Sequence, residues 1–128
     1  MMAIGRRGVL AGTAGLLAMP AVRARAQQQG VKIGLVAVQT GPQAALGTQL
    51  RDGFLQGLKH LDGKLGGLAA EVVPIDDELR PEVAVTKVRA ALERDKVDFV
   101  VGVVFSNILA AIMRPVTESN TFLIYIIR

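Results

Sequence analysis

The two residues best suited to bind a ligand are Ser106 and Asn107, which stand between a strand pattern and a helix pattern. Residues 97–105 are mostly β-branched or aromatic, as in a strand buried on both faces of a parallel sheet. After Asn107, apolar residues recur at helical spacing. The first N–H groups of a helix lack intrahelical partners and carry a partial positive charge. The sequence therefore predicts an anion-binding corner, suited to a carboxylate, where this strand ends and the helix begins.

Ser106 has two alternative interpretations. It could be a helix N-cap without a ligand, because serine is among the residues preferred at that position. It could also be a catalytic nucleophile, but a nucleophilic serine needs an adjacent base. The one histidine, His60, falls near the end of an earlier predicted helix and is most simply a surface residue. We therefore expect no enzymatic activity.

A second polar cluster, Asp76-Asp77-Glu78, follows another predicted strand. Three neighbouring carboxylates could bind a hard cation. The simpler interpretation is a solvated loop whose carboxylates cap the following helix. We favour that loop, and we expect neither a metal nor a cofactor.

Strand and helix patterns alternate along the rest of the chain. The predicted strands cover residues 31–38, 68–75, 97–105 and 121–127. In the first intervening helix, a leucine- and phenylalanine-rich stripe from Leu46 to Leu61 should face a core. Pro74 cannot donate to a ladder, which places the second strand at a sheet edge. Pro81 suits the first position of the second helix, and Pro115 should kink or shorten the third.

The order β-α-β-α-β-α-β predicts an α/β fold with a doubly wound parallel sheet, covered on both faces, in the strand order 2-1-3-4. Open sheets of this kind bind ligands beyond the carboxyl ends of their strands, which is where Ser106 and Asn107 fall. The sequence stops at Arg128, directly after the fourth strand. We therefore interpret residues 27–128 as an incomplete lobe of something larger.

Residues 1–26 are interpreted as an export signal. Arg6-Arg7 precede an uncharged apolar run over residues 8–22, and Ala24-Arg25-Ala26 provides a cleavage site after Ala26. The arginine pair is also similar to that of a twin-arginine signal. A retained membrane anchor is the alternative, but the run is short for a bilayer span and Pro20 interrupts it. We expect a periplasmic mature chain.

Charge and cysteine content exclude some functions. The chain has 15 basic and 11 acidic residues, and four of the basic residues lie in the predicted leader. The rest of the chain therefore has no net charge and no basic patch, which argues against nucleic-acid binding. The absence of cysteine means that no disulfide is needed.

Several short motifs follow one another in a fixed order. They are Lys32-Ile33-Gly34, Thr40-Gly41-Pro42, Arg51-Asp52-Gly53, Asp76-Asp77, Asp95-Lys96-Val97-Asp98 and Val101-Gly102. Behind an export signal, this succession resembles the N-terminal lobe of leucine/isoleucine/valine-type periplasmic solute-binding proteins, which serve ABC importers. The resemblance implies a two-lobe type I periplasmic binding fold that traps a branched-chain amino acid or similar small carboxylate, with permease subunits as partners.

The same resemblance implies roles for particular residues. Ser106 and the N–H groups near Asn107 would hold the ligand carboxylate, and Val104 and Phe105 would line the pocket beside it. Leu46 would present an apolar side chain to the ligand from the first loop. The chain departs from the family at residues 125–128, where Tyr-Ile-Ile-Arg supplies bulk instead of hydrogen-bond donors. It also lacks a second lobe, as a truncated gene would.

Three other interpretations stay open. The protein could be a sensor subunit of the same fold that signals to a regulatory partner, or a non-functional gene fragment. A receiver or flavodoxin-like domain also begins β-α-β-α-β. Its phospho-acceptor aspartate would end the third strand, where this chain has Val104-Phe105.

Overall fold

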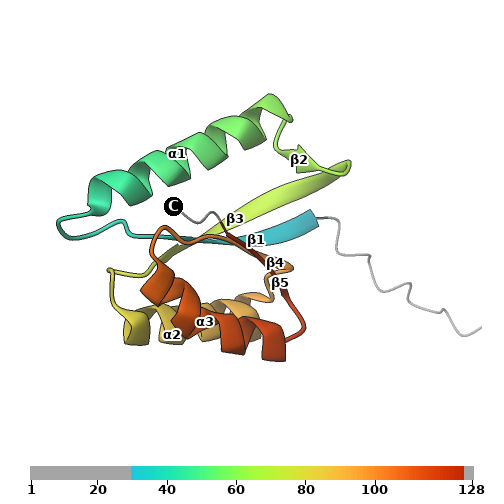
Figure 1. Ribbon diagram of the computed structural model, residues 1–128. Coiled ribbons are helices and arrows are strands. Elements are labelled where there is room, and N and C mark those ends of the chain that lie inside the picture. Colours follow the sequence, from blue (N-terminus) through green and yellow to red (C-terminus); the bar gives the residue numbers. More distant parts are fainter. Residues whose placement is uncertain (1–29, 126–128) are drawn as a thin grey trace, which may run out of the picture.

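A computed structural model describes residues 30–125 of the chain (Figure 1). Its elements are β1 (Gly30–Ala37), α1 (Ala44–His60), β2 (Lys64–Leu65), β3 (Leu68–Asp76), α2 (Pro81–Ala90), the π-helical turn η1 (Ala91–Asp95), β4 (Phe99–Gly102), α3 (Ser106–Glu118) and β5 (Phe122–Tyr125). The predicted alternation of strands and helices is confirmed, with β2 and η1 as additions. The predicted export signal and residues 126–128 lie outside this range.

The strands form one sheet in the order β2-β3-β1-β4-β5. β1 pairs in parallel with β3 and β4, and β4 pairs in parallel with β5, which confirms the predicted order of the four main strands. β2 is antiparallel and pairs only with Leu68 and Ala69. Over residues 30–125, the stretch of β3 that contains Pro74 has no strand on its outer side. The edge position predicted from Pro74 is therefore confirmed.

A two-residue turn joins β2 to β3. Gly66 and Gly67 both have positive φ, 58° and 83°. Type I′ turns, which are common in two-residue hairpins, need positive φ at both central residues, which glycine adopts without steric cost. The pair Gly66-Gly67 therefore extends the sheet by a short hairpin, where the sequence predicted only the end of a segment.

Helices α2 and α3 cover one face of the sheet and form the core with it (Figure 1). Side chains alternate between the faces of a strand, so Val36 and Val100 point into this core while their neighbours point away. Burying a valine or isoleucine completely contributes about 1.5–3 kcal/mol. The core residues are Val36, Ile75, Ala84, Val88, Ala91, Val97, Val100, Val103, Ile108, Leu109, Ile112 and Val116.

The opposite face is covered by α1 alone, so helices lie on both faces of the sheet as predicted, but the cover on this face is incomplete (Figure 1). Of the α1 residues only Gly47 is buried, and Leu61, at the end of the predicted stripe, is 55 % exposed. On β5, Phe122 and Ile124 are 71 % and 54 % exposed. Phe122 has one aromatic neighbour, Phe99, at a ring-centroid distance of 6.0 Å.

The proline predictions have different outcomes for α2 and α3. Pro81 is the first residue of α2, as predicted. Pro115 lies inside α3, which continues to Glu118 and is therefore not cut short. Within the described part of the chain, no helix is long and apolar enough to cross a membrane.

Candidate functional site

The candidate site lies where the carboxyl ends of β1 and β4 meet. These strands are parallel neighbours, and Val36 pairs with Gly102, so they end at the same level. From β1 the chain passes to α1 on one face of the sheet, and from β4 it passes to α3 on the other (Figure 1). The connections that follow these two neighbouring strands therefore leave toward opposite faces of the sheet. Open α/β sheets bind ligands at such switch points.

The backbone between β4 and α3 adopts an unusual conformation. Gly102 and Val103 have φ of 110° and 69°, and a side chain at Gly102 would overlap the carbonyl of Val36. Positive φ in a β-branched residue is rare and costs about 1–3 kcal/mol. Val103 is held there because its N–H donates to the Val36 carbonyl at 2.9 Å and its side chain is buried. Strain fixed by its surroundings in this way is typical of ligand sites.

Helix α3 begins directly after this strained turn. Phe105, with φ −112° and ψ 134°, occupies the N-cap position, and no side chain caps the helix. Ser106 is the first helical residue, so the N-cap interpretation of Ser106 is wrong. The N–H of Leu109 donates to the Phe105 carbonyl at 3.1 Å, which leaves the N–H groups of residues 106–108 without intrahelical acceptors. Ser106 and Asn107 are both exposed.

Val104 and Phe105 connect the strained turn to the helix. Both are half-buried, and Phe105 packs against the core formed with α2 and α3. Phe105 therefore lies next to the candidate site and also packs the start of α3 against the core. Such packing fixes the direction in which the free N–H groups of the helix point.

Leu46 lies in the first turn of α1, as its place at the start of the helical stripe predicted, and not in the loop that the family resemblance implied; it is 36 % exposed. Its N–H donates to the Gln43 carbonyl at 3.0 Å. The next residue, Gly47, packs so closely on the end of β1 that a side chain there would overlap the backbone of Val38. α1 therefore starts directly against the strand that ends at the switch point.

The acidic loop after β3 differs from its prediction. Asp77 is fully buried, so the loop is not simply solvated. The Oδ1 atom of Asp76 accepts from the N–H of Glu78 at 3.1 Å, and Oδ1 of Asp77 accepts from the N–H of Leu79 at 2.8 Å. These bonds close turns within the loop, and the N-cap of α2 is Arg80, without a side-chain cap. The prediction that the carboxylates cap α2 is therefore wrong.

Asp76 and Asp77 have opposite electrostatic environments. Burial raises the pKa of Asp77, the N–H of Leu79 opposes that shift, and the charge of Asp76 adds to it. Burial alone would also raise the pKa of Asp76, but hydrogen bonds from Gln39, Glu78 and Thr40 outweigh it and the pKa is lowered. Between residues 30 and 125, no three His, Asp or Glu side chains are arranged to hold a metal ion.

The comparison with family models covers nearly all of the described chain. Residues 30–127 match the model of the family described as periplasmic binding protein. The chain belongs to the periplasmic binding protein family. A comparison with curated proteins found no match.

Solved structures of this family share the fold. An ABC transporter substrate-binding protein from Sphaerobacter thermophilus is 29 % identical, with a TM-score of 0.71 over 75 % of this chain and 26 % of its own. The branched-chain amino acid transporter substrate binding protein LivJ from Streptococcus pneumoniae, in complex with isoleucine, is 28 % identical, with a TM-score of 0.70 over 75 % of this chain and 28 % of its own. The chain thus spans about a quarter of the length of these structures.

A third structure shows the fold alone. The solute binding protein of an ABC transporter from Rhodopseudomonas palustris, in complex with 3,4-dihydroxybenzoic acid, is 23 % identical. It has a TM-score of 0.73 over 77 % of this chain and 27 % of its own.

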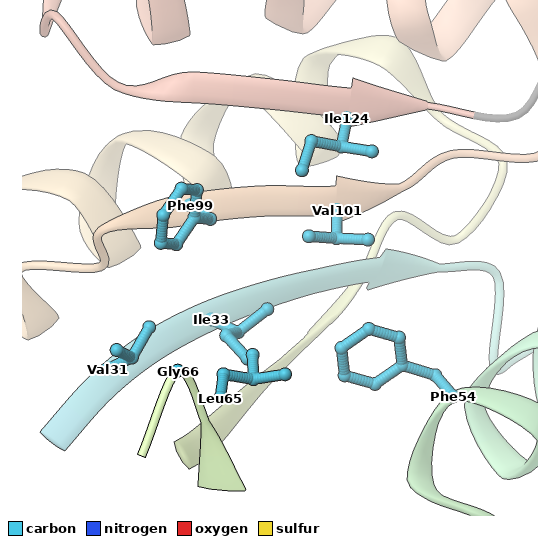
Figure 2. A pocket seen from close by; sticks show the side chains of 8 residues that line it. All are labelled: Val31, Ile33, Phe54, Leu65, Gly66, Phe99, Val101 and Ile124. Carbon is cyan, nitrogen blue, oxygen red and sulfur yellow. The ribbon is translucent and has the colours of Figure 1, made fainter. Parts of the chain in front are cut away.

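A cavity of about 490 Å³ lies away from the switch point, between α1 and the sheet. Figure 2 shows Phe54 of α1 opposite Ile33, Val101 and Ile124 of the sheet, with Val31, Leu65, Gly66 and Phe99 completing the lining. These side chains are apolar and offer no hydrogen bond to a carboxylate. In this member of the periplasmic binding protein family, the cavity belongs to the incompletely covered face and is not a second carboxylate site.

The contacts that fix the loop after β1 could not be read from the sequence. Gln39 bonds through its N–H to Asp76 and through its side chain to Arg51. The predicted strand order contained part of the signal, because it made the end of the second strand a neighbour of the end of the first. Asp76 was thereby placed next to Gln39, but no pattern indicated which group its carboxylate would bind.

Proposed function

We propose that this protein is the exported solute-binding component of an ATP-driven importer and that it binds a branched-chain amino acid or a similar small carboxylate. Its partners would be the permease subunits of that importer, and its location the periplasm. The proposal includes no catalysis. The one histidine, His60, is exposed on α1 beside Gln56, with 3.2 Å between the side-chain nitrogens, and is not placed to activate Ser106.

The observation that carries this proposal is the corner at the switch point. Gly102 and Val103 hold the chain in a strained turn, and α3 then starts with free N–H groups and two exposed polar residues, Ser106 and Asn107. A helix N-terminus favours negative charge through its dipole and its unpaired donors. A carboxylate held there would accept hydrogen bonds from the N–H groups and from the Ser106 hydroxyl.

The ligands named for two relatives fit a carboxylate site. Isoleucine is an aliphatic amino acid and 3,4-dihydroxybenzoic acid is an aromatic acid, but both have a carboxylate. Carboxylate recognition alone does not select the rest of the ligand, which must be recognised by other groups. We propose Leu46, Val104 and Phe105 as apolar contacts on this lobe.

Replacing Ser106 with alanine should weaken the binding of L-isoleucine. A hydrogen bond to a charged group contributes about 1–3 kcal/mol, so the affinity should fall about 5- to 150-fold. NMR titration of the chain measures this change even at millimolar affinity, and the amide signals of residues 106–108 should shift on binding.

Two controls make this titration specific. Ser119→Ala removes a hydroxyl at the other end of α3, where Ser119 Oγ donates to the Val116 carbonyl at 2.7 Å, and it should leave the affinity unchanged. L-Isoleucinamide lacks the carboxylate and should not shift the corner amides. Unchanged affinity in Ser106→Ala would remove this hydroxyl from the site, and equal binding of the amide would exclude carboxylate recognition.

We also propose that the leader is removed after Ala26 during export. Small residues at positions 24 and 26 are what a signal peptidase requires. N-terminal sequencing of the exported protein should begin at Gln27, and Ala26→Phe should block cleavage at this bond. An exported wild-type protein that still began with Met1 would contradict this proposal.

A further inference from the structure

Asp76 joins the loops that follow β1 and β3. Its Oδ1 atom accepts from the N–H of Gln39 at 2.8 Å and from the N–H of Glu78 at 3.1 Å. Gln39 belongs to the loop between β1 and α1, and Glu78 belongs to the loop between β3 and α2. One carboxylate oxygen therefore fixes two loops that lie far apart in the sequence.

Arg51 holds the same loop from α1. Its Nη1 atom donates to Gln39 Oε1 at 3.2 Å, while Nε and Nη2 donate to Asp52 Oδ1 at 3.0 and 2.9 Å. Asp52 thus orients the guanidinium group toward the loop. Gln39 is held by its backbone from the β3 side and by its side chain from α1.

The hydrogen bond between Asp76 and Gln39 lies next to the candidate site. Asp76 pairs with Ala37 on the side of β1 away from β4. The β1–α1 loop, which contains Gln39, therefore lies between Asp76 and the switch point. Five residues after Gln39, α1 begins, with Leu46 in its first turn.

We propose that Asp76, acting through Gln39, is a positioning residue that fixes the wall of the ligand site formed by the β1–α1 loop and the first turn of α1. This inference rests on the proposed function, because the wall matters only if a ligand binds at the switch point. Asp76 itself does not contact the ligand.

Asp98 supplies a matched control at the amino ends of β1 and β4, the end of these strands away from the switch point. Its Oδ2 atom accepts from the N–H of Lys32 at 2.8 Å, and its own N–H donates to the Lys32 carbonyl at 2.8 Å. Asp98→Ala therefore also removes a carboxylate that binds a backbone N–H, but far from the loop. Asp76→Asn is the conservative variant, because its amide oxygen still accepts from both N–H groups.

Amide hydrogen exchange of the full chain tests the positioning role. In Asp76→Ala, exchange of residues 39–46 should be faster by about tenfold or more, because each 1.4 kcal/mol of lost stabilisation corresponds to tenfold. Asp76→Asn and Asp98→Ala should leave these rates close to wild type. Equal loop exchange in Asp76→Ala and Asp98→Ala, or failure of Asp76→Asn to restore protection, would overturn the role of Asp76.

A titration with L-isoleucine then tests the link to the ligand. Asp76→Ala should bind more weakly than wild type, while Asp76→Asn and Asp98→Ala should bind as wild type does. A loosened loop with unchanged affinity would overturn the proposal that this loop is a wall of the site. Failure of the wild-type chain to bind would contradict the proposed function alone, and the exchange comparison would still decide whether Asp76 fixes the loop.

Discussion

Gly47→Ala is expected to destabilise the protein by about 3 kcal/mol or more, at or above the upper end of the range for overpacking. The methyl group would overlap the backbone of Val38, which cannot move aside as a flexible side chain could. α1 would have to shift away from the end of β1, carrying Leu46 with it. Urea unfolding followed by circular dichroism measures the loss, which is large compared with the stability of a small domain.

Gly53→Ala on the same helix is the matched control. A side chain at Gly53 would meet nothing within 4 Å, and alanine favours helix over glycine by about 1 kcal/mol. The two substitutions are chemically identical and should therefore change the free energy of unfolding in opposite directions. If Gly47→Ala were as stable as wild type, the close contact between α1 and β1 would be wrong.

Asp77→Asn is expected to stabilise the protein at neutral pH, because it replaces a carboxylate whose charge is disfavoured by burial with a neutral amide of the same shape. Asp77 is fully buried, and among the described residues its Oδ2 atom has no hydrogen-bond partner. Burial raises the pKa of Asp77 above the ordinary 3.8. Asparagine keeps an oxygen for the N–H of Leu79 and removes the charge.

The sign of the pH dependence follows from that raised pKa. The folded protein holds the proton more tightly than the unfolded chain, so the contribution of Asp77 is fully present below the unfolded pKa. It is lost as the pH rises through the raised, folded pKa. The stability difference between Asp77→Asn and wild type should therefore be small near pH 3.5 and grow toward pH 7 in urea titrations. Glu93→Gln, at an exposed position, controls for the loss of one negative charge, and the same pH profile in both variants would contradict this account.

Much of the fold could be predicted because it depends on local patterns. The alternation of strand and helix patterns determined the order of elements, and Pro74 identified the edge strand because proline has no N–H for a ladder. The corner at Ser106 was visible because a β-branched run changes there to helical periodicity.

The conformational details of the site could not be predicted in the same way. Val103 has positive φ although its side chain disfavours it, because the core and the Val36 carbonyl hold it there. That turn ends β4 at Gly102 and puts Phe105 at the N-cap position, which one alternative interpretation had given to Ser106. The burial of Asp77 depends on positive φ at Glu78 and Leu79, which no propensity indicates. A tertiary contact holds Val103, whereas hydrogen bonds within the loop close the turns at Glu78 and Leu79.

The unequal covering of the two faces of the sheet divides the molecule into parts that open at different free energies. Regions with few buried contacts unfold locally at lower cost than the densely packed remainder. α1, buried only at Gly47, belongs to the part that opens easily, whereas α3 is held by five buried residues. Under the proposed function, the carboxylate would bind to the rigid half, and Leu46 would bring a contact from the labile half. A ligand that contacted both halves would couple their opening. It would raise the free energy of local opening of α1 more than the free energy of global unfolding.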